Sequence, residues 1–399
     1  MRDTVRKFLE LPANARVLLL IQLVICSGSF IVIPYLAVYL TTSLSLGATF
    51  VALQLTVKLL TQRGGMVPGG ILADRIGALP VIIIGLLCRV ASYVLYVLAP
   101  AAWMITLASF LLGASAALFT PASKKLFATM ARDEEKILIF SLRSVVNNLG
   151  VALGGGFGAL LANLPPGYFF LLAGVLQIVA MIPLFSQWGD EKKKRDASGD
   201  KPRAAGSIEW KNVGALLIHP AYMALMFMCF GYNVLYVQLE ITLPLYVNDV
   251  FSKSAVGGVF IVNALVVILT QVPLNLYMHK WFSPFSVVTI GFLASAVGLG
   301  GLGLQPFLPV VYVLIGIYTL GELFIDPTLD ARTAGIVGDR LAGTAFGLLG
   351  LAAMAGGAVG SITGSYIYSH WSATALWGSA CSFALFFALA TFLMGRKMK

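Results

Sequence analysis

Three carboxylates follow one another at intervals of four residues inside an apolar stretch: Glu322, Asp326 and Asp330. Residues four apart share one face of a helix, so the acidic groups form a stripe, with Thr319 on the same face. A charge at the bilayer centre costs about 2.5–3.5 kcal/mol on insertion scales, so the three groups cannot all stay ionised cheaply. The stripe favours a group that takes up a proton on one side and releases it on the other. We therefore assign Glu322 and Asp326 to proton coupling and expect Asp330, beside Arg332, in a solvated or gate-forming pair.

A fourth acidic residue lies in the apolar stretch 220–248. Asn233, Tyr236 and Glu240 fall on one face of a helix over this stretch, with Pro244 a turn further. We interpret Glu240 as a carboxylate in the outer half of a central cavity and as a third candidate for proton coupling.

Embedded bases lie in the other half of the chain. Lys58 shares one helix face with Gln54, and Arg89 occupies the middle of the stretch 79–99. The hypothesis is that bases and acids face each other across the cavity, pairing in one state and separating in another. The alternative, equally open, is that Arg89 and Arg143 only join helices within one half. If Lys58 and Arg89 face the cavity, they favour an anionic or zwitterionic cargo.

Aromatic and amide residues occur near these charges in both halves. The candidates for a cavity lining are Tyr35, Tyr39, Gln54, Tyr232, Tyr236, Asn263 and Phe324. Such side chains make an adaptable apolar surface, which suits loose recognition of amphipathic compounds better than tight binding of sugars. Taken singly, an aromatic residue in a membrane helix is more often a packing residue or an interface anchor.

The composition indicates which elements must hold these residues in place. Hydrophobic residues make up 59% of the 399 residues and charged residues 11%, against roughly 25% charged residues in a soluble domain. A helix that crosses a bilayer takes about 20 apolar residues, so this length allows about twelve spans. The apolar runs predict spans at 17–42, 49–73, 79–99, 102–125, 137–162, 168–187, 220–248, 255–279, 284–304, 308–332, 341–369 and 372–394.

Lysine and arginine are sorted along this pattern. Of the 27 Lys and Arg residues, 22 fall at one set of helix ends and only Lys253 falls in the opposite loops. The remaining four lie inside apolar stretches: Lys58, Arg63, Arg89 and Arg143. Because loops rich in these residues stay in the cytoplasm, both termini are expected there. The sorting also accounts for the net charge of +10 without a nucleic-acid partner.

Residue types for catalysis or metal binding are scarce. The four cysteines are isolated within apolar segments, and the three histidines are single residues at helix ends. We therefore expect no metal site, no cofactor and no enzymatic activity. The sequence has no Gly-x-x-x-x-Gly-Lys-Ser/Thr loop, so ATP is not expected to supply energy.

The two halves of the chain look like copies. Ile33-Pro34-Tyr35-Leu36 corresponds to Leu243-Pro244-Leu245-Tyr246, and Leu60-Thr61-Gln62 corresponds to Leu269-Thr270-Gln271 at nearly the same offset. A duplication of six helices plus six is a common plan of transporters. It predicts an N-terminal six-helix bundle over 1–187, a cytoplasmic linker over 188–214 and a C-terminal six-helix bundle over 215–399.

The segment between the second and third predicted spans reads Gly-Gly-Ile-Leu-Ala-Asp-Arg-Ile-Gly-Ala over 69–78. It resembles the loop signature of the major facilitator superfamily. The resemblance implies a cytoplasmic gate that opens and closes during transport, and its residues here are Gly70, Asp74, Arg75 and Gly77. Asp74 can accept hydrogen bonds from a neighbouring helix N-terminus, and Arg143 is placed to reach Asp74 and to belong to the same gate.

The chain departs from the family pattern at two places. The basic pair that usually follows the loop glycine is replaced by Ala78 and Leu79, and the arginine of many proton-coupled relatives is replaced by Ser109 in the fourth span. These departures put part of the family's charge relay and its standard coupling scheme in question.

The fifth predicted span carries a glycine ladder. Residues 150–159 read Gly-Val-Ala-Leu-Gly-Gly-Gly-Phe-Gly-Ala and resemble the Gly-x-x-x-Gly-Pro-x-x-Gly-Gly motif of exporters in this family. Gly150, Gly154 and Gly158 line one helix face and let a neighbouring helix approach closely. Ordinary helix packing explains the ladder about as well as a role in export.

These resemblances imply an all-helical polytopic membrane protein with a major facilitator fold: twelve transmembrane helices in two pseudo-symmetric six-helix bundles. The chain looks most like the twelve-span drug:proton antiporters. That likeness implies a monomer in the bacterial inner membrane that exports amphipathic small molecules by alternating access, driven by inward proton flow. A dedicated exporter of a metallophore, a lipid or a metabolite is the alternative with the same fold, and a non-transporting membrane sensor is the alternative from another class.

Overall fold

The computed structural model describes residues 2–36, 39–44, 46–98, 101–161, 164–165, 167–198, 210–304 and 307–397, and these residues form helices and no strand. We call residues 2–198 the N-half and residues 210–397 the C-half. The helices of the N-half are α1 (Arg2–Glu10), α2 (Ala13–Val32), α4 (Ala48–Gly64), α5 (Met66–Ile76), α6 (Ala78–Leu98), α7 (Ala102–Met130), α8 (Lys136–Leu161) and α9 (Gly167–Ser198), with the short η1 (Ile33–Tyr35), η2 (Tyr39–Ser43) and η3 (Asp133–Glu135). The helices of the C-half are α10 (Trp210–Ile218), α11 (Pro220–Glu240), α12 (Thr242–Val250), α13 (Lys253–Trp281), α14 (Pro284–Leu302), α15 (Leu308–His370) and α16 (Ala373–Lys397).

The predicted number of spans can be recovered from these helices. Ten segments of the described chain are long and apolar enough to cross a membrane. One of them, α15, is 63 residues long and joins the predicted spans 308–332 and 341–369 through a kink at Gly338 (φ 64°, ψ 174°), a backbone conformation that glycine tolerates. The second predicted span, 49–73, comprises α4, with 17 residues, and most of α5. The all-helical, twelve-span fold class predicted from the sequence is therefore confirmed.

Helix boundaries follow local capping chemistry. α14 begins at Pro284, and the hydroxyl of Ser283 before it accepts a hydrogen bond from the Ser286 N–H at 3.3 Å. Proline suits the first helical position because the N–H that it lacks would have no partner there. The first predicted span, 17–42, is not one continuous helix: α2 ends at Val32, and η1, which contains Pro34, follows it. Proline removes a backbone donor, so the regular hydrogen-bond ladder is interrupted at this point.

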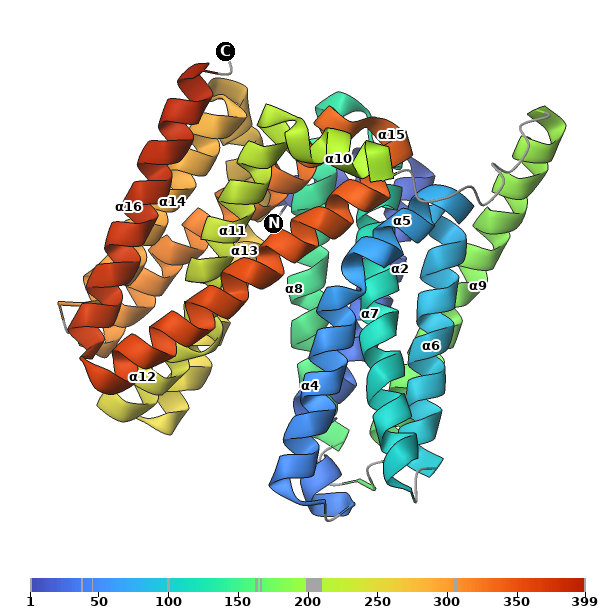
Figure 1. The fold of residues 1–399 in the computed structure, drawn as a ribbon, viewed down its shortest axis with the longest axis horizontal. Coiled ribbons are helices and arrows are strands. Elements are labelled where there is room, and N and C mark those ends of the chain that lie inside the picture. The colour runs from blue at the N-terminus through green and yellow to red at the C-terminus, as the bar shows by residue number, and fades with distance from the viewer. Residues whose placement is uncertain are drawn as a thin grey trace.

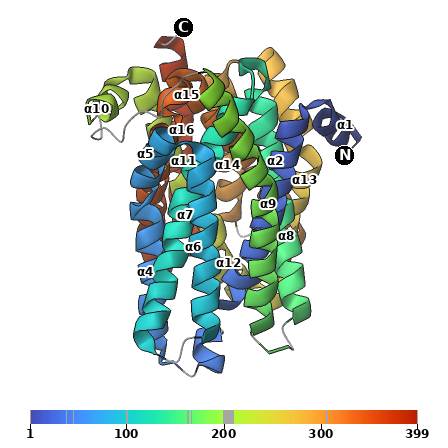
Figure 2. The same cartoon turned by 90° about the vertical axis from the view of Figure 1, so that its right-hand side faces the viewer.

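The helices pack mainly within their own half: α2 against α8 and α6 against α7 in the N-half, α11 and α14 against α15 in the C-half. Both chain termini lie at one end of the molecule, together with α5 and α10 (Figures 1 and 2). We call this the basic end, because α5, α7 and α16 each carry Lys or Arg near the helix end that lies there. The other end, with η2 and α12, is the distal end. The ribbons of the two halves meet at the basic end and diverge toward the distal end (Figure 1).

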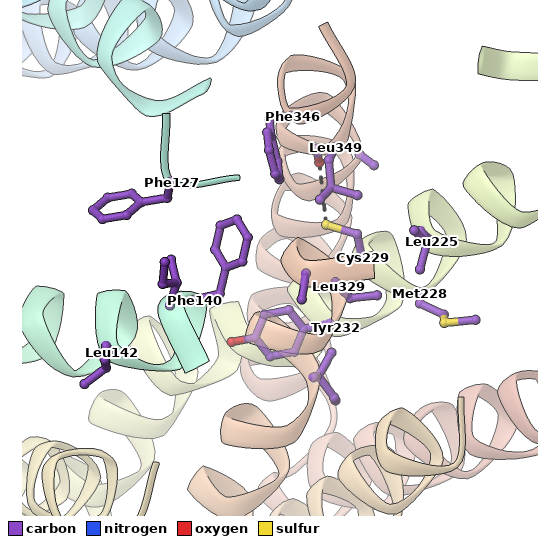
Figure 3. Packing of buried hydrophobic residues seen from close by; sticks show 14 of the residues in the cluster. Phe127, Phe140, Leu142, Leu225, Met228, Cys229, Tyr232, Leu329, Phe346 and Leu349 are labelled. Atoms are coloured by element: carbon purple, nitrogen blue, oxygen red, sulfur yellow. Dashed lines mark hydrogen bonds between the residues drawn. The ribbon is translucent and has the colours of Figure 1, made fainter. Parts of the chain in front are cut away.

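Where the halves meet, α15 packs against α5, α7 and α8, and α13 packs against α8. Figure 3 shows the buried residues of this region, with Phe127 and Phe140 from the N-half and Leu329 and Phe346 from α15. The ring centroids of Phe140 and Phe346 lie 5.9 Å apart. A continuous apolar core thus joins the two halves at the basic end.

Two connections differ from the loops expected from the sequence. The signature segment over 69–78 is largely helical, because α5 runs from Met66 to Ile76 and only Gly77, with φ 99°, leaves helical geometry. Both ends of the linker predicted over 188–214 are helical, since α9 continues to Ser198 and α10 begins at Trp210. Residues 199–209 of that linker lie outside the described part of the chain.

Candidate functional site

Asp74, near the end of α5, binds the second segment of α15 close to its start at the Gly338 kink. Its Oδ1 accepts a hydrogen bond from the Gly343 N–H (2.9 Å), and its Oδ2 accepts from the N–H and the hydroxyl of Thr344 (2.7 and 2.6 Å). Lys125 Nζ lies 2.7 Å from the same carboxylate. As predicted, Asp74 accepts hydrogen bonds from a neighbouring helix, and these bonds join the two halves. The donors lie five and six residues after the kink at Gly338, in the N-terminal part of a new helical segment, where the helix dipole favours a carboxylate.

Two glycines let α5 and α15 approach this closely. A Cβ on Gly70 would meet the carbonyl oxygen of Gly343, and a Cβ on Gly343 would meet the carbonyl oxygen of Gly70. Both contacts are with backbone atoms, which cannot rotate away as a side chain can. The close approach of the two halves therefore depends on the absence of a side chain at these positions.

A second cross-half contact involves Asp330, which is buried on α15. Its Oδ1 lies 2.6 Å from Lys124 Nζ, and its Oδ2 lies 3.8 Å from Arg143 Nη1. Asp330 thus forms ion pairs at the basic end, but with Lys124 and Arg143 and not with the neighbouring Arg332. Residues two apart on a helix do not face each other, so Asp330 and Arg332 point in different directions. Lys136 Nζ also donates across the halves, to the carbonyl of Ala334 at 3.0 Å.

The structure corrects the expectation that Arg143 reaches Asp74. Arg143 lies on α8, and its ion pair in the described chain is with Asp330, whereas Lys125 from α7 pairs with Asp74. From the sequence, Lys124 and Lys125 were counted only among the charges at one set of helix ends. The signal that could have singled them out is a Lys-Lys pair inside the end of the apolar stretch 102–125.

Glu322 and Asn263 are brought together in the middle of the C-half. Asn263 Nδ2, on α13, donates to Glu322 Oε2 and to Thr319 Oγ1, each at 3.0 Å. Asp326 lies one turn further along α15 and has no hydrogen-bond or ion-pair partner among the described residues. Both carboxylates are half-buried. This part of α15 therefore holds two acidic groups that no base neutralises within the described chain.

Glu240 lies at the end of α11 and is exposed. Tyr236 lies one turn earlier, and its ring centroid lies 5.7 Å from that of Tyr232. All three predicted coupling carboxylates lie in the C-half, Glu240 on α11 and Glu322 and Asp326 on α15.

Arg89 is buried in the N-half and joins three helices. Its Nε donates to Ser115 Oγ at 2.7 Å, its Nη1 donates to Ser29 Oγ at 2.6 Å, and its guanidinium lies 5.6 Å from the centre of the Phe119 ring. These contacts favour the hypothesis that Arg89 joins helices within one half. Lys58, on α4, is half-buried and has no such partner among the described residues.

Three predicted cavity residues lie away from the carboxylates. Phe324 is two residues from Glu322, so it projects from the other side of α15, where it is buried. Tyr35 packs inside the N-half, with its ring centroid 5.1 Å from that of Phe169. Gln54, on the same helix face as Lys58, is completely buried.

The glycine ladder of α8 packs against the first transmembrane helix. A Cβ on Gly150 would meet Cys26, one on Gly154 would meet the carbonyl oxygen of Ser27, and one on Gly158 would meet the ring of Tyr35. Gly155, between them, has open space in the Cβ direction. The ladder therefore sets a close α2–α8 contact within the N-half.

Replacing Gly154 with alanine is expected to destabilise the protein by about 1–3 kcal/mol, the usual cost of overpacking a tight contact. Gly155→Ala is the matched control and is expected to be neutral or stabilising by up to about 1 kcal/mol, because alanine favours helix and nothing obstructs its Cβ. The measurement is the temperature at which the detergent-solubilised protein loses its monodisperse peak on size-exclusion chromatography. An equal loss in both variants would show that the ladder does not set this contact.

Nothing in the described residues brings three or more His, Cys, Asp or Glu side chains into an arrangement that could hold a metal ion. The chemistry available in this region is proton exchange by carboxylates and electrostatic recognition. Two helical halves, joined at one end by ion pairs and by the hydrogen bonds of Asp74, and holding carboxylates in an apolar interior, are the architecture of a polytopic membrane transport protein.

The comparisons with known proteins agree with this class. The family model described as Major Facilitator Superfamily matches residues 18–285, and the chain belongs to this family. It is therefore a transporter of small molecules, and its family is not a class of enzymes.

Curated relatives and solved structures extend over nearly the whole chain. It is 26% identical to the multidrug resistance protein MdtH of Cronobacter sakazakii, over 88% of this chain and 85% of that protein, and 26% identical to MdtH of Yersinia enterocolitica, over 88% and 86%. Among solved structures, the human organic anion transporter MFSD10 has a TM-score of 0.75 at 15% identity, covering 95% of this chain and 100% of that chain. The proton:xylose symporter XylE has a TM-score of 0.73 at 15% identity, covering 95% and 94%.

Proposed function

We propose that this protein is a proton-coupled exporter of amphipathic small molecules that works by alternating access. The observation that carries the proposal is the environment of Glu322, a half-buried carboxylate that receives one hydrogen bond from a neutral amide. Asp326 lies beside it without a partner in the described chain, and no base forms an ion pair with either group. Carboxylates in such surroundings can exchange protons, whereas a permanent ion pair would fix their charge.

The relatives named multidrug resistance protein MdtH support the export of varied compounds. The sorting of Lys and Arg supports a cytoplasmic location for the basic end and for both termini. The enterobacterial relatives support a location in the bacterial inner membrane, where we expect a monomer. In that orientation, the contacts of Asp74 and Asp330 close the cytoplasmic side of the molecule. Protons from the outside would first bind to the carboxylates. These contacts would then open, and the cavity would again face the cytoplasm.

Flux through the purified protein in proteoliposomes tests this function. Vesicles with an acidic lumen should accumulate amphipathic compounds from a panel of lipophilic cations, neutral compounds and amphipathic anions, and a protonophore should abolish the accumulation. Empty vesicles are the control. Flux of one compound alone would indicate a dedicated exporter, flux that ignores the protonophore would contradict proton coupling, and no flux of any kind would favour a sensor.

A further inference from the structure

The two bases that reach Asp330 come from different helices of the N-half. Lys124 Nζ, on α7, lies 2.6 Å from Asp330 Oδ1, and Arg143 Nη1, on α8, lies 3.8 Å from Oδ2. α7 and α8 make little direct contact with each other, whereas α2 packs extensively against α8. Direct packing between α7 and α8 therefore contributes little to the spacing of the two bases.

A buried glutamine of α2 connects these two helices. Gln22 Nε2 donates to Asn147 Oδ1 of α8 at 2.9 Å, and Gln22 Oε1 accepts a hydrogen bond from Ser123 Oγ of α7 at 3.0 Å. Gln22 and Ser123 are both buried. Both ends of the Gln22 amide are thus used, one on each helix. Because a buried polar group without a partner is unfavourable, this bridge holds α7 and α8 at defined positions around α2.

The bridge is attached close to each of the two bases. Ser123 directly precedes Lys124 on α7, and Asn147 lies one turn after Arg143 on the same face of α8. On α7, Ser123 is bonded toward α2, Lys124 toward α15 and Lys125 toward α5. Side-chain directions along a helix are related by its fixed periodicity, so a contact that fixes the direction of one residue also fixes that of its neighbours. The bridge therefore sets the directions in which Lys124 and Arg143 leave their helices.

We propose that Gln22 is a positioning residue for closure of the basic end: its amide sets the rotation and spacing of α7 and α8, so that both bases converge on Asp330. This inference rests on the proposed function, in which the contacts at the basic end close the cytoplasmic side. Gln22 acts through the two bases, since its own hydrogen bonds go to Ser123 and Asn147. The ion pairs of Asp330 join the two halves, so loss of the bridge weakens the closed arrangement.

The test compares two buried glutamines that both form hydrogen bonds with other helices of the N-half. Gln22→Met keeps the length of the side chain and removes both hydrogen bonds of the bridge. Gln177→Met is the matched control: Gln177 is completely buried on α9 and donates to the Ile25 carbonyl of α2 at 3.2 Å, a bond that involves neither α7 nor α8. Opening of the basic end is followed by hydrogen exchange at the amides of Gly343 and Thr344, with the full-length protein in phosphatidylcholine nanodiscs.

Gln22→Met should speed exchange at these two amides about fivefold, the change expected from the net loss of one typical hydrogen bond. Gln177→Met should change it by less than about twofold, because the bases keep their directions. In a background that carries Asp330→Asn, Gln22→Met should likewise add less than about twofold, because the bases then have no carboxylate to meet. Unchanged exchange in Gln22→Met, an equal effect in both glutamine variants, or the same effect with and without Asp330, would overturn the positioning role.

Ser123→Ala is a milder variant that removes only the α7 end of the bridge and should also speed exchange. It decides the question if Gln22→Met does not give a monodisperse protein, and unchanged exchange in Ser123→Ala would then reject the proposal. The measurement needs no flux, so this inference and the proposed function can fail separately. Proton-driven flux without the expected exchange effects would reject the positioning role alone, and those effects without proton-driven flux would reject the proposed function alone.

Discussion

Replacing Glu322 with glutamine is expected to reduce uptake driven by a proton gradient to the level of empty vesicles, while exchange of substrate across the membrane continues. Glutamine keeps the size of the side chain and can accept the hydrogen bond from Asn263, but it cannot bind and release a proton. Asp326→Asn is expected to act in the same direction, and it disturbs no hydrogen bond of the described chain. Both activities are measured in the same proteoliposomes, with a pH gradient for uptake and with equal pH and preloaded substrate for exchange.

Glu134→Gln is the control for removal of a carboxylate, since Glu134 is exposed at the basic end. This variant should keep both activities. Full gradient-driven uptake by both Glu322→Gln and Asp326→Asn would remove these residues from the mechanism. Loss of exchange together with uptake would instead assign Glu322 to substrate binding.

The number and order of the membrane spans could be predicted because hydropathy alone determines which segments enter the bilayer. The same property could not indicate where a helix continues beyond the apolar core. Thus the signature segment over 69–78 was expected as a loop, although α5 is helical as far as Ile76, and the two spans of α15 form one long kinked element. Helical structure in these polar connections depends on contacts between the halves, which a hydropathy pattern does not contain.

For the site, helix periodicity indicated which residues share a face but not which helix lies opposite. Glu322, Asp326 and Asp330 form the predicted stripe on α15, yet Asn263 pairs with the first and Lys124 with the last. Those partners are distant in sequence, and a single chain gives no direct signal for such a pairing. Asp74 is the exception, because a carboxylate beside glycines that permit close helix approach was expected to accept hydrogen bonds from a neighbouring helix, and it accepts them from Gly343 and Thr344.

Replacing Gly70 with alanine is expected to prevent closure at the basic end and to reduce transport at least about tenfold. The new Cβ would meet the carbonyl oxygen of Gly343, so the α5–α15 contact can form only if the backbone shifts. Overpacking of this kind costs about 1–3 kcal/mol, and 1.4 kcal/mol already changes the population of the closed state tenfold. The direct measurement is hydrogen exchange at the amides of Gly343 and Thr344, which Asp74 protects.

Gly335→Ala is the matched control on the other helix, since Gly335 is exposed and a Cβ there meets nothing within 4 Å. It should leave transport and exchange unchanged, whereas Gly70→Ala should speed exchange at Gly343 and Thr344 by about tenfold or more. Asp74 would remain present in Gly70→Ala, so lost protection would come from separation of the halves rather than from loss of the acceptor. Unchanged protection in Gly70→Ala, together with normal transport, would mean that the close glycine contact is not required for closure. The hydrogen bonds of Asp74 and the Lys124–Asp330 ion pair would then hold the basic end closed without it.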